Sequence, residues 1–311
     1  QLLLLLVLWL IGRMAMWFSS FVPAIVVALA DMSFLPLLAV AIAYALMRRP
    51  QVRNSIFLVL IILLIVTNGL MHAEWLGWTD DTASWALTVA ILNIVLMITL
   101  LAGRIVPSFT RNAMIRKQQL DNHPKQIAML DRVSIGAVAA VLVLQILSVP
   151  DPVLGAAAVV AGLVNLLRQA LWRPDWVVGE PILWSLHLAY LWIPIGMFSL
   201  AGAIFFDFPT QGGAMHVFGI GVIGGMTLAM MTRAPLGHTG RPLVVRSSIA
   251  LAYGLLALAA IVRGFLLDML PGGYFQVVLA AGVLWMTGFA IFAATYLPLL
   301  LGPSLKTQAA D

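Results

Sequence analysis

The 311-residue chain has no cysteine, which excludes disulfide bonds, iron–sulfur clusters and thiolate metal sites. Histidine, methionine and carboxylate side chains are therefore the ligands left for a metal ion. Charged residues are also scarce, at 9%, whereas hydrophobic residues make up 62% and the mean hydropathy is +1.05. This composition lies outside the range of water-soluble domains. The net charge of +5 comes from basic residues in short separate segments, so no nucleic-acid partner is expected.

Apolar runs follow one another along the chain, and each is long enough to cross a hydrocarbon core of roughly 30 Å as a helix of about 20 residues. The runs are too long for barrel strands, so they predict an all-α, polytopic transmembrane helix bundle. We expect a single membrane domain over residues 1–311 with about ten spans. The spans are placed at residues 1–18, 22–47, 54–74, 82–103, 129–149, 153–171, 180–204, 213–232, 246–267 and 273–301.

Basic and acidic residues alternate between successive connections. Lys and Arg gather after the second span, in an expected loop at 104–128 and after the eighth span, whereas Glu74, Asp80 and Asp207 lie in the other connections. The positive-inside rule places the basic side, including the 104–128 loop, in the cytoplasm. We therefore predict a multi-pass protein of the bacterial cytoplasmic (inner) membrane, with the lipid bilayer as its partner. Function must lie within the bundle or at its rims, because no connection is long enough for a catalytic module.

Polar residues inside lipid are costly and mark the first places to look for chemistry. Asn68 and His72 lie four residues apart in the third span, so the amide can orient the imidazole. The histidine is either a ligand or a cap at the helix end. Arg13 and Asp31 lie at comparable depth in two consecutive spans and are expected to pair in a structural role. Further intramembrane polar residues need partners that the sequence does not name: Asn93, Asn165 and Arg263.

His216 opens the eighth span and is followed by a run of glycines and methionines that continues to Met231. Such a small-residue face admits either a neighbouring helix or a flat macrocycle against bare backbone. The methionines are either packing residues or soft copper ligands.

The segment after this span, Thr232 to Pro242, holds two prolines and two glycines, which predict that the helix ends there. It places His238 between Arg233 and Arg241. The two arginines are either an anion clamp, for a haem propionate or a lipid headgroup, or simple positive-inside anchors.

His187 lies two turns into the seventh span, where a neutral imidazole either binds metal or makes a hydrogen bond between helices. His123, in the charged loop, is expected to be solvated. By depth, the intramembrane histidines form an outer pair, His72 with His216, and an inner pair, His187 with His238. Two layers would suit two cofactors.

The run from His216 to Pro242, with its GGMTLAMMTR and LGHTGRP stretches, resembles the NnrS family of haem- and copper-containing membrane proteins linked to the bacterial nitric-oxide response. Asn68 with His72, the GRIVPSFTR stretch and His187 with Tyr190 support the resemblance. Members of that family have about 12 spans and a histidine motif in an early helix. Since Gln1 lies within an apolar run, we expect at least one earlier helix.

The resemblance implies a haem–copper protein, with b-type haem, that binds or handles nitric oxide and supports resistance to nitrosative stress. The candidate haem-site residues are His72, His216, Asn68, Arg233 and Arg241, and the candidate metal ligands are His187, His238, His72 and His216. Turnover, storage and shielding of nitric oxide all remain open. One alternative is a cofactor-free transporter, whose intramembrane Asn, Arg and Asp would line a path. Another is an enzyme like a nitric-oxide reductase or oxidase, which needs several histidines on one copper.

Overall fold

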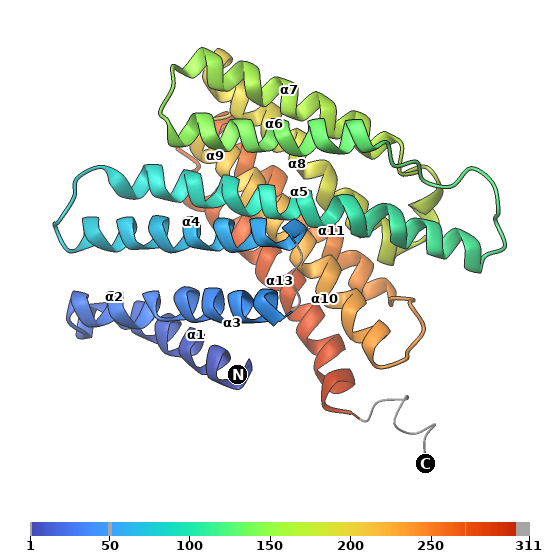
Figure 1. Cartoon of the computed structure of the whole chain (residues 1–311), viewed down its shortest axis with the longest axis horizontal. Coiled ribbons are helices and arrows are strands. Elements are labelled where there is room, and N and C mark those ends of the chain that lie inside the picture. The colour runs from blue at the N-terminus through green and yellow to red at the C-terminus, as the bar shows by residue number, and fades with distance from the viewer. Residues whose placement is uncertain (1, 49–51, 271, 303–311) are drawn as a thin grey trace. The chain divides into compact units, whose positions relative to one another are not determined.

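The computed structural model describes residues 2–48, 52–270 and 272–302, with only the backbone of 52–54. Its contacts divide the chain into two compact units, residues 1–97 and 98–311, which are described separately (Figure 1). The described residues form helices joined by short connections and contain no strand, which confirms the predicted all-α class. That the units form a single membrane domain stays a prediction.

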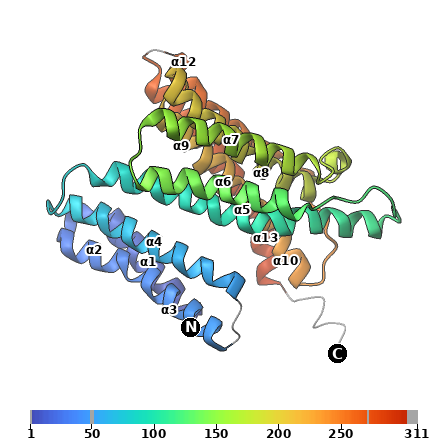
Figure 2. The same cartoon turned by 45° about the horizontal axis from the view of Figure 1, so that its top comes forward.

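The first unit contains helices from the N-terminal third of the chain. They are α1 (Leu2–Trp17), the short η1 (Ser19–Phe21), α2 (Ala24–Met32), α3 (Phe34–Arg48), α4 (Val52–Trp75) and the first part of α5 (Thr82–Arg116). Helices α1, α2, α3 and α4 pack on one another (Figure 2). A Cβ at Gly12 of α1 would lie only 3.0 Å from the Asp31 Cα of α2, so the absence of a side chain at Gly12 lets the two backbones approach closely.

The second unit contains the rest of α5 and the helices that follow. They are α6 (Ala128–Ile146), α7 (Asp151–Ala170), η2 (Trp176–Gly179), α8 (Pro181–Phe206), α9 (Gln211–His216), η3 (Val217–Gly224), α10 (Gly225–His238), α11 (Ser247–Ile261), η4 (Val262–Leu266), α12 (Leu267–Met269) and α13 (Tyr274–Leu301). Helix α7 packs between α6 and α8, and α11 packs on α13. Both η3 and η4 are π-helical turns inside longer helices, an uncommon geometry that is frequent at functional sites.

Each predicted span corresponds to a helix. Within the described residues, nine helices are long and apolar enough to cross a membrane, and the shorter apolar helix Leu2–Trp17 occupies the position of the first predicted span. Helices α2 and α3 count as one span, Ala24–Arg48, interrupted at Ser33, whose hydroxyl donates a 2.8 Å hydrogen bond to the Ala30 carbonyl. The predicted multi-pass character is confirmed.

The predicted end of the fourth span at residue 103 is wrong, because α5 continues through Pro107 to Arg116. Proline lacks the N–H that would bond to the carbonyl four residues earlier, here that of Gly103. The Gln126 side-chain amide donates to this carbonyl at 3.0 Å, so the polar group that proline leaves unpaired is satisfied. The connection to α6 is therefore shorter than the predicted 104–128 loop.

The prediction that the segment from Thr232 ends the helix is also wrong, since α10 continues through Pro235 to His238. A proline removes one backbone hydrogen bond, but Leu236 is buried in the apolar core of the second unit, where its packing helps to offset that loss. The helix ends where the Thr239 hydroxyl and backbone N–H both donate to the Pro235 carbonyl. Arg233 and His238 consequently lie on a helix, and only Thr239–Pro242 is irregular.

Candidate functional site

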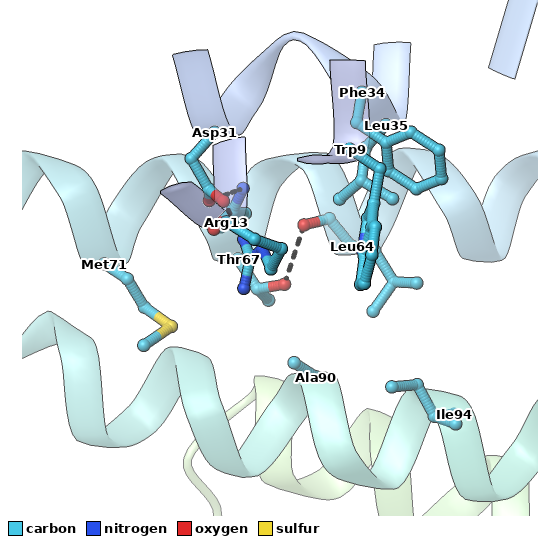
Figure 3. Close-up of a pocket in the computed structure, with 11 residues that line it drawn as sticks. Trp9, Arg13, Asp31, Phe34, Leu35, Leu64, Thr67, Met71, Ala90 and Ile94 are labelled. Atoms are coloured by element: carbon cyan, nitrogen blue, oxygen red, sulfur yellow. Dashed lines mark hydrogen bonds and ion pairs between the residues drawn. The ribbon is translucent and has the colours of Figure 1, made fainter. Parts of the chain in front are cut away.

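In the first unit, Asp31 joins three polar side chains from two other helices. Its carboxylate is buried and forms an ion pair with Arg13 of α1, which confirms the predicted pairing (Figure 3). It also accepts hydrogen bonds from Asn68 Nδ2 at 3.1 Å and from His72 Nε2 at 3.0 Å, both on α4. Asn68 and His72 are thus brought together as predicted, but it is Asp31 that orients the imidazole.

A cavity of about 300 Å³ lies beside this cluster and is bounded by α1, α2, α3, α4 and the first part of α5 (Figure 3). Arg13, Asp31 and Asn68 line its polar wall, whereas residues such as Trp9 and Ile94 make the remaining walls apolar. The His72 ring is buried behind this wall rather than among the lining residues. The cavity therefore places a charged cluster against an apolar space.

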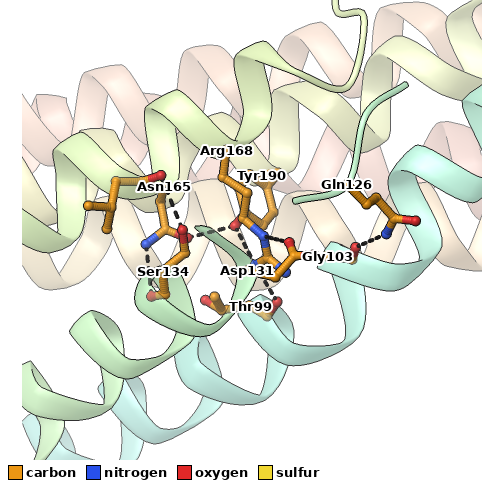
Figure 4. A network of polar contacts seen from close by, with 9 residues as sticks. Thr99, Gly103, Gln126, Asp131, Ser134, Asn165, Arg168 and Tyr190 are labelled. Atoms are coloured by element: carbon orange, nitrogen blue, oxygen red, sulfur yellow. Dashed lines mark hydrogen bonds and ion pairs between the residues drawn. The ribbon is translucent and has the colours of Figure 1, made fainter. Parts of the chain in front are cut away.

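In the second unit, a polar network centres on Arg168 of α7, which is 3% exposed (Figure 4). Its guanidinium donates to Asp131 Oδ1 at 2.7 Å, to the Tyr190 hydroxyl at 3.1 Å and to the Thr99 carbonyl at 3.3 Å. The Tyr190 hydroxyl in turn donates to Asn165 Oδ1 at 2.6 Å, so Asn165 finds the partner that the sequence did not name. This network ties α5, α6, α7 and α8 together.

His187 of α8 bridges to α5, because its Nε2 and the Thr110 hydroxyl lie 3.0 Å apart and form a buried hydrogen bond. The hydrogen bond between helices that was one of the two interpretations of His187 is therefore present. Its other ring nitrogen, Nδ1, is buried and has no hydrogen-bond partner in the described part of the chain. A ligand role for His187 stays a prediction.

His216 ends α9, directly before the π-helical turn η3. The glycine face behind it is filled by a helix, since a Cβ at Gly221 would overlap Trp192 of α8 and a Cβ at Gly225 would touch Ala189. A Cβ at Gly219, by contrast, would meet no atom within 4 Å. The sequence allowed either a neighbouring helix or a flat macrocycle against these glycines. At Gly221 and Gly225 the structure shows a neighbouring helix, α8.

The two arginines of the predicted anion clamp have different surroundings. Arg233 is buried, its guanidinium lies 3.8 Å from the centre of the Phe109 ring, and its Nη1 has no hydrogen-bond partner among the described residues. Arg241 instead lines a cavity together with Arg246. His238 is exposed at the end of α10.

Across residues 2–48, 52–270 and 272–302, no three His, Asp or Glu side chains come close enough to share one metal ion. A family model described as NnrS protein matches residues 1–304. The chain belongs to the NnrS family. The resemblance noted from the sequence is therefore confirmed over nearly the whole chain. No curated protein and no solved structure matches this NnrS protein.

Sequence reasoning missed the Arg168 network of this NnrS protein. From the sequence, Asn165 is singled out as needing a partner, but Arg168, Asp131 and Thr99 are not. The available signal was the spacing of Asn165, Arg168 and Gln169, which places three polar side chains on one face of an otherwise apolar helix. All three are buried and bonded to neighbouring helices, Asn165 through the Ser134 carbonyl of α6.

Proposed function

We propose that this protein binds b-type haem within the bacterial cytoplasmic membrane and handles nitric oxide through it. Its membership of the NnrS family supports the proposal, because the resemblance of these sequences implies haem and a role in nitrosative stress. Haem iron, when bound, supplies a coordination position for nitric oxide. Nitric oxide is small and apolar enough to arrive through lipid, so the protein needs no polar entry channel.

The contact between His72 and Asp31 is the single observation that carries this proposal. Histidines that bind metal almost always donate their other ring N–H to a carboxylate, a carbonyl or water, which fixes the ring and raises its basicity. Asp31 engages Nε2 of a buried His72 in this way, which leaves Nδ1 as the nitrogen available to iron. Arg13 pairs with the same carboxylate, so a positive charge faces the group that engages His72.

His216 is proposed as the second ligand. It lies at a π-helical turn, where local widening of the helix re-aims the side chains around it. His72 lies in the first unit and His216 in the second, and each proposed ligand is tested by its own variant. Copper is not included, since the described residues provide no group of three His, Asp or Glu ligands, and the metal-ligand roles of His187 and His238 stay predictions.

The absorption spectrum of the purified protein tests the proposal. His72→Ala and His216→Ala should each remove or shift the haem bands, because a lost ligand changes the coordination of iron itself. Asp31→Asn should retain haem with shifted bands, since it weakens the orientation of His72 but leaves the imidazole in place. His123→Ala is the matched control, because this ring lies in the connection after α5, where it hydrogen-bonds to the Gln119 carbonyl at 3.0 Å.

Unchanged spectra in both ligand variants, in protein that still inserts and purifies, would overturn the assignment. The cavity beside Asp31 favours a second candidate, a transporter, because Arg13, Asp31 and Asn68 line an intramembrane space. A transporter requires no haem. Wild-type protein that purifies without haem bands, and takes no haem up when haem is added, would favour transport.

A further inference from the structure

A second cavity, of about 620 Å³, lies at one end of the second unit. It is formed by the end of α10, the connection after it, the start of α11 and the last turns of α13. Helices α10, α11 and α13 contact one another in this unit (Figure 1). The cavity shares no lining residue with the Asp31 cluster or the Arg168 network.

The lining of this cavity combines positive charge with apolar walls. Among the described residues that line it, Arg241 and Arg246 are the charged ones, and none is acidic. The walls are provided by apolar side chains such as Val245, Ile249 and Leu299. Tyr296 contributes its ring, because its hydroxyl already donates to the Thr232 carbonyl at 2.7 Å. The lining therefore suits a molecule with an anionic group attached to an apolar chain.

The position of the cavity indicates where this molecule comes from. Two membrane-spanning helices end beside it, Gln211–His238 and Tyr274–Leu301, and a third begins there, Ser247–Met269. Helix ends lie at the level of lipid headgroups, and arginines at that level attract anionic lipids. A guanidinium also matches the geometry of a phosphate group, to which it can donate two parallel hydrogen bonds.

We propose that this cavity binds one anionic phospholipid, with its phosphate held by Arg241 and Arg246 and an acyl chain along Ile249, Val245 and Leu299. A soluble anion would use the two arginines but leave the apolar walls without a role. This proposal does not depend on haem, so it can fail while the proposed haem function holds, and the reverse is also true.

The experiment measures binding of phosphatidylglycerol to the full chain by native mass spectrometry, with phosphatidylcholine as the neutral reference. Arg241→Gln and Arg246→Gln should each weaken phosphatidylglycerol binding about fivefold, because one arginine near an anionic headgroup contributes an attraction of that size. The double variant should weaken it further, and phosphatidylcholine binding should change little. Arg111→Gln is the matched control, an exposed arginine of α5 outside the cavity, and should bind like wild type.

A second variant tests the apolar walls with both arginines intact. Ala294→Trp places a large ring in the cavity and should reduce phosphatidylglycerol binding while leaving the charge unchanged. Added inorganic phosphate should not displace the lipid. The proposal is overturned if the double variant binds phosphatidylglycerol like wild type, or if Arg111→Gln weakens binding equally. Displacement by phosphate alone, or no effect of Ala294→Trp, would also overturn it in favour of a simple anion site.

Discussion

Replacing Asp131 by alanine tests whether the Arg168 network holds the second unit together. The substitution removes the carboxylate that accepts from Arg168 Nε at 2.7 Å and leaves a guanidinium that is 3% exposed. Removing one partner of a buried ion pair destabilises proteins by about 3–5 kcal/mol. Because the Asp131 side chain is 23% exposed, and Arg168 keeps its bonds to Thr99 and Tyr190, we expect about 2–3 kcal/mol here.

The free energy of unfolding, measured by titrating SDS into detergent-solubilised protein, is the quantity to compare. The double variant Asp131→Ala/Arg168→Met should be no less stable than the single variant Asp131→Ala. Arg168→Met removes the buried charge that Asp131→Ala leaves unpaired. Asp175→Ala is the control, because it breaks an exposed ion pair with Arg173 and should change stability little. Additive losses in the double variant, or no loss in Asp131→Ala, would refute the reasoning.

Three further predictions concern the same unit. Gly103→Ala should destabilise it by about 1–3 kcal/mol in the same titration, because the added Cβ would overlap the Arg168 guanidinium, and wild-type stability would contradict this packing. Gln126→Ala should lose about 1 kcal/mol, since it leaves the Gly103 carbonyl without its donor, and should increase amide hydrogen exchange in α5 near that residue. The hydrogen bond and charge of Arg173 lower the pKa of Asp175 in the folded protein. The pair therefore stabilises the fold at pH values above about 3.9, the pKa of an aspartate in the unfolded chain. This contribution is lost as the pH falls through the lower pKa of the folded protein. Proteolysis of the connection before α8 should therefore accelerate below about pH 4 in wild type and show a smaller change in Asp175→Asn.

The sequence predicts the spans well because an apolar window long enough to cross lipid is a local property. Most ends agree to within a few residues. The two large errors are in helices that continue through a proline, since the predicted fourth span ends at residue 103, before Pro107, and the predicted eighth ends at the segment that contains Pro235. In each case the surroundings decide otherwise, since Gln126 satisfies the carbonyl freed by Pro107 and Leu236 packs into the core beside Pro235. Gln126 lies far from Pro107 in the sequence, and the burial of Leu236 depends on how α10 packs on its neighbours, so neither effect can be read from the local sequence.

The candidate sites are predicted less completely than the spans. A polar residue in a membrane span indicates that a partner must be present, but the sequence does not identify that partner. The pairing of Arg13 with Asp31 followed from their equal depth, and the structure confirms it. That Asp31 also holds Asn68 and His72 depends on how α2 packs against α4. Arg168 was missed because an arginine near a helix end is usually a topology signal, and only its buried neighbours distinguish it.

The way buried polar groups are satisfied separates structural from binding roles in this protein. Arg168 directs hydrogen bonds to a carboxylate, a hydroxyl and a carbonyl on three neighbouring helices, so it stabilises the bundle. His187 Nδ1 and Arg233 Nη1 are buried with no hydrogen-bond partner among the described residues, a state that costs about 1–3 kcal/mol per group. His72 is intermediate, since Asp31 engages its Nε2 and the proposed function assigns its Nδ1 to a ligand. An unpaired buried polar group destabilises the fold unless another interaction offsets the lost hydrogen bond. Experiments on ligand binding should therefore begin with His72, His187 and Arg233 rather than with the Arg168 network.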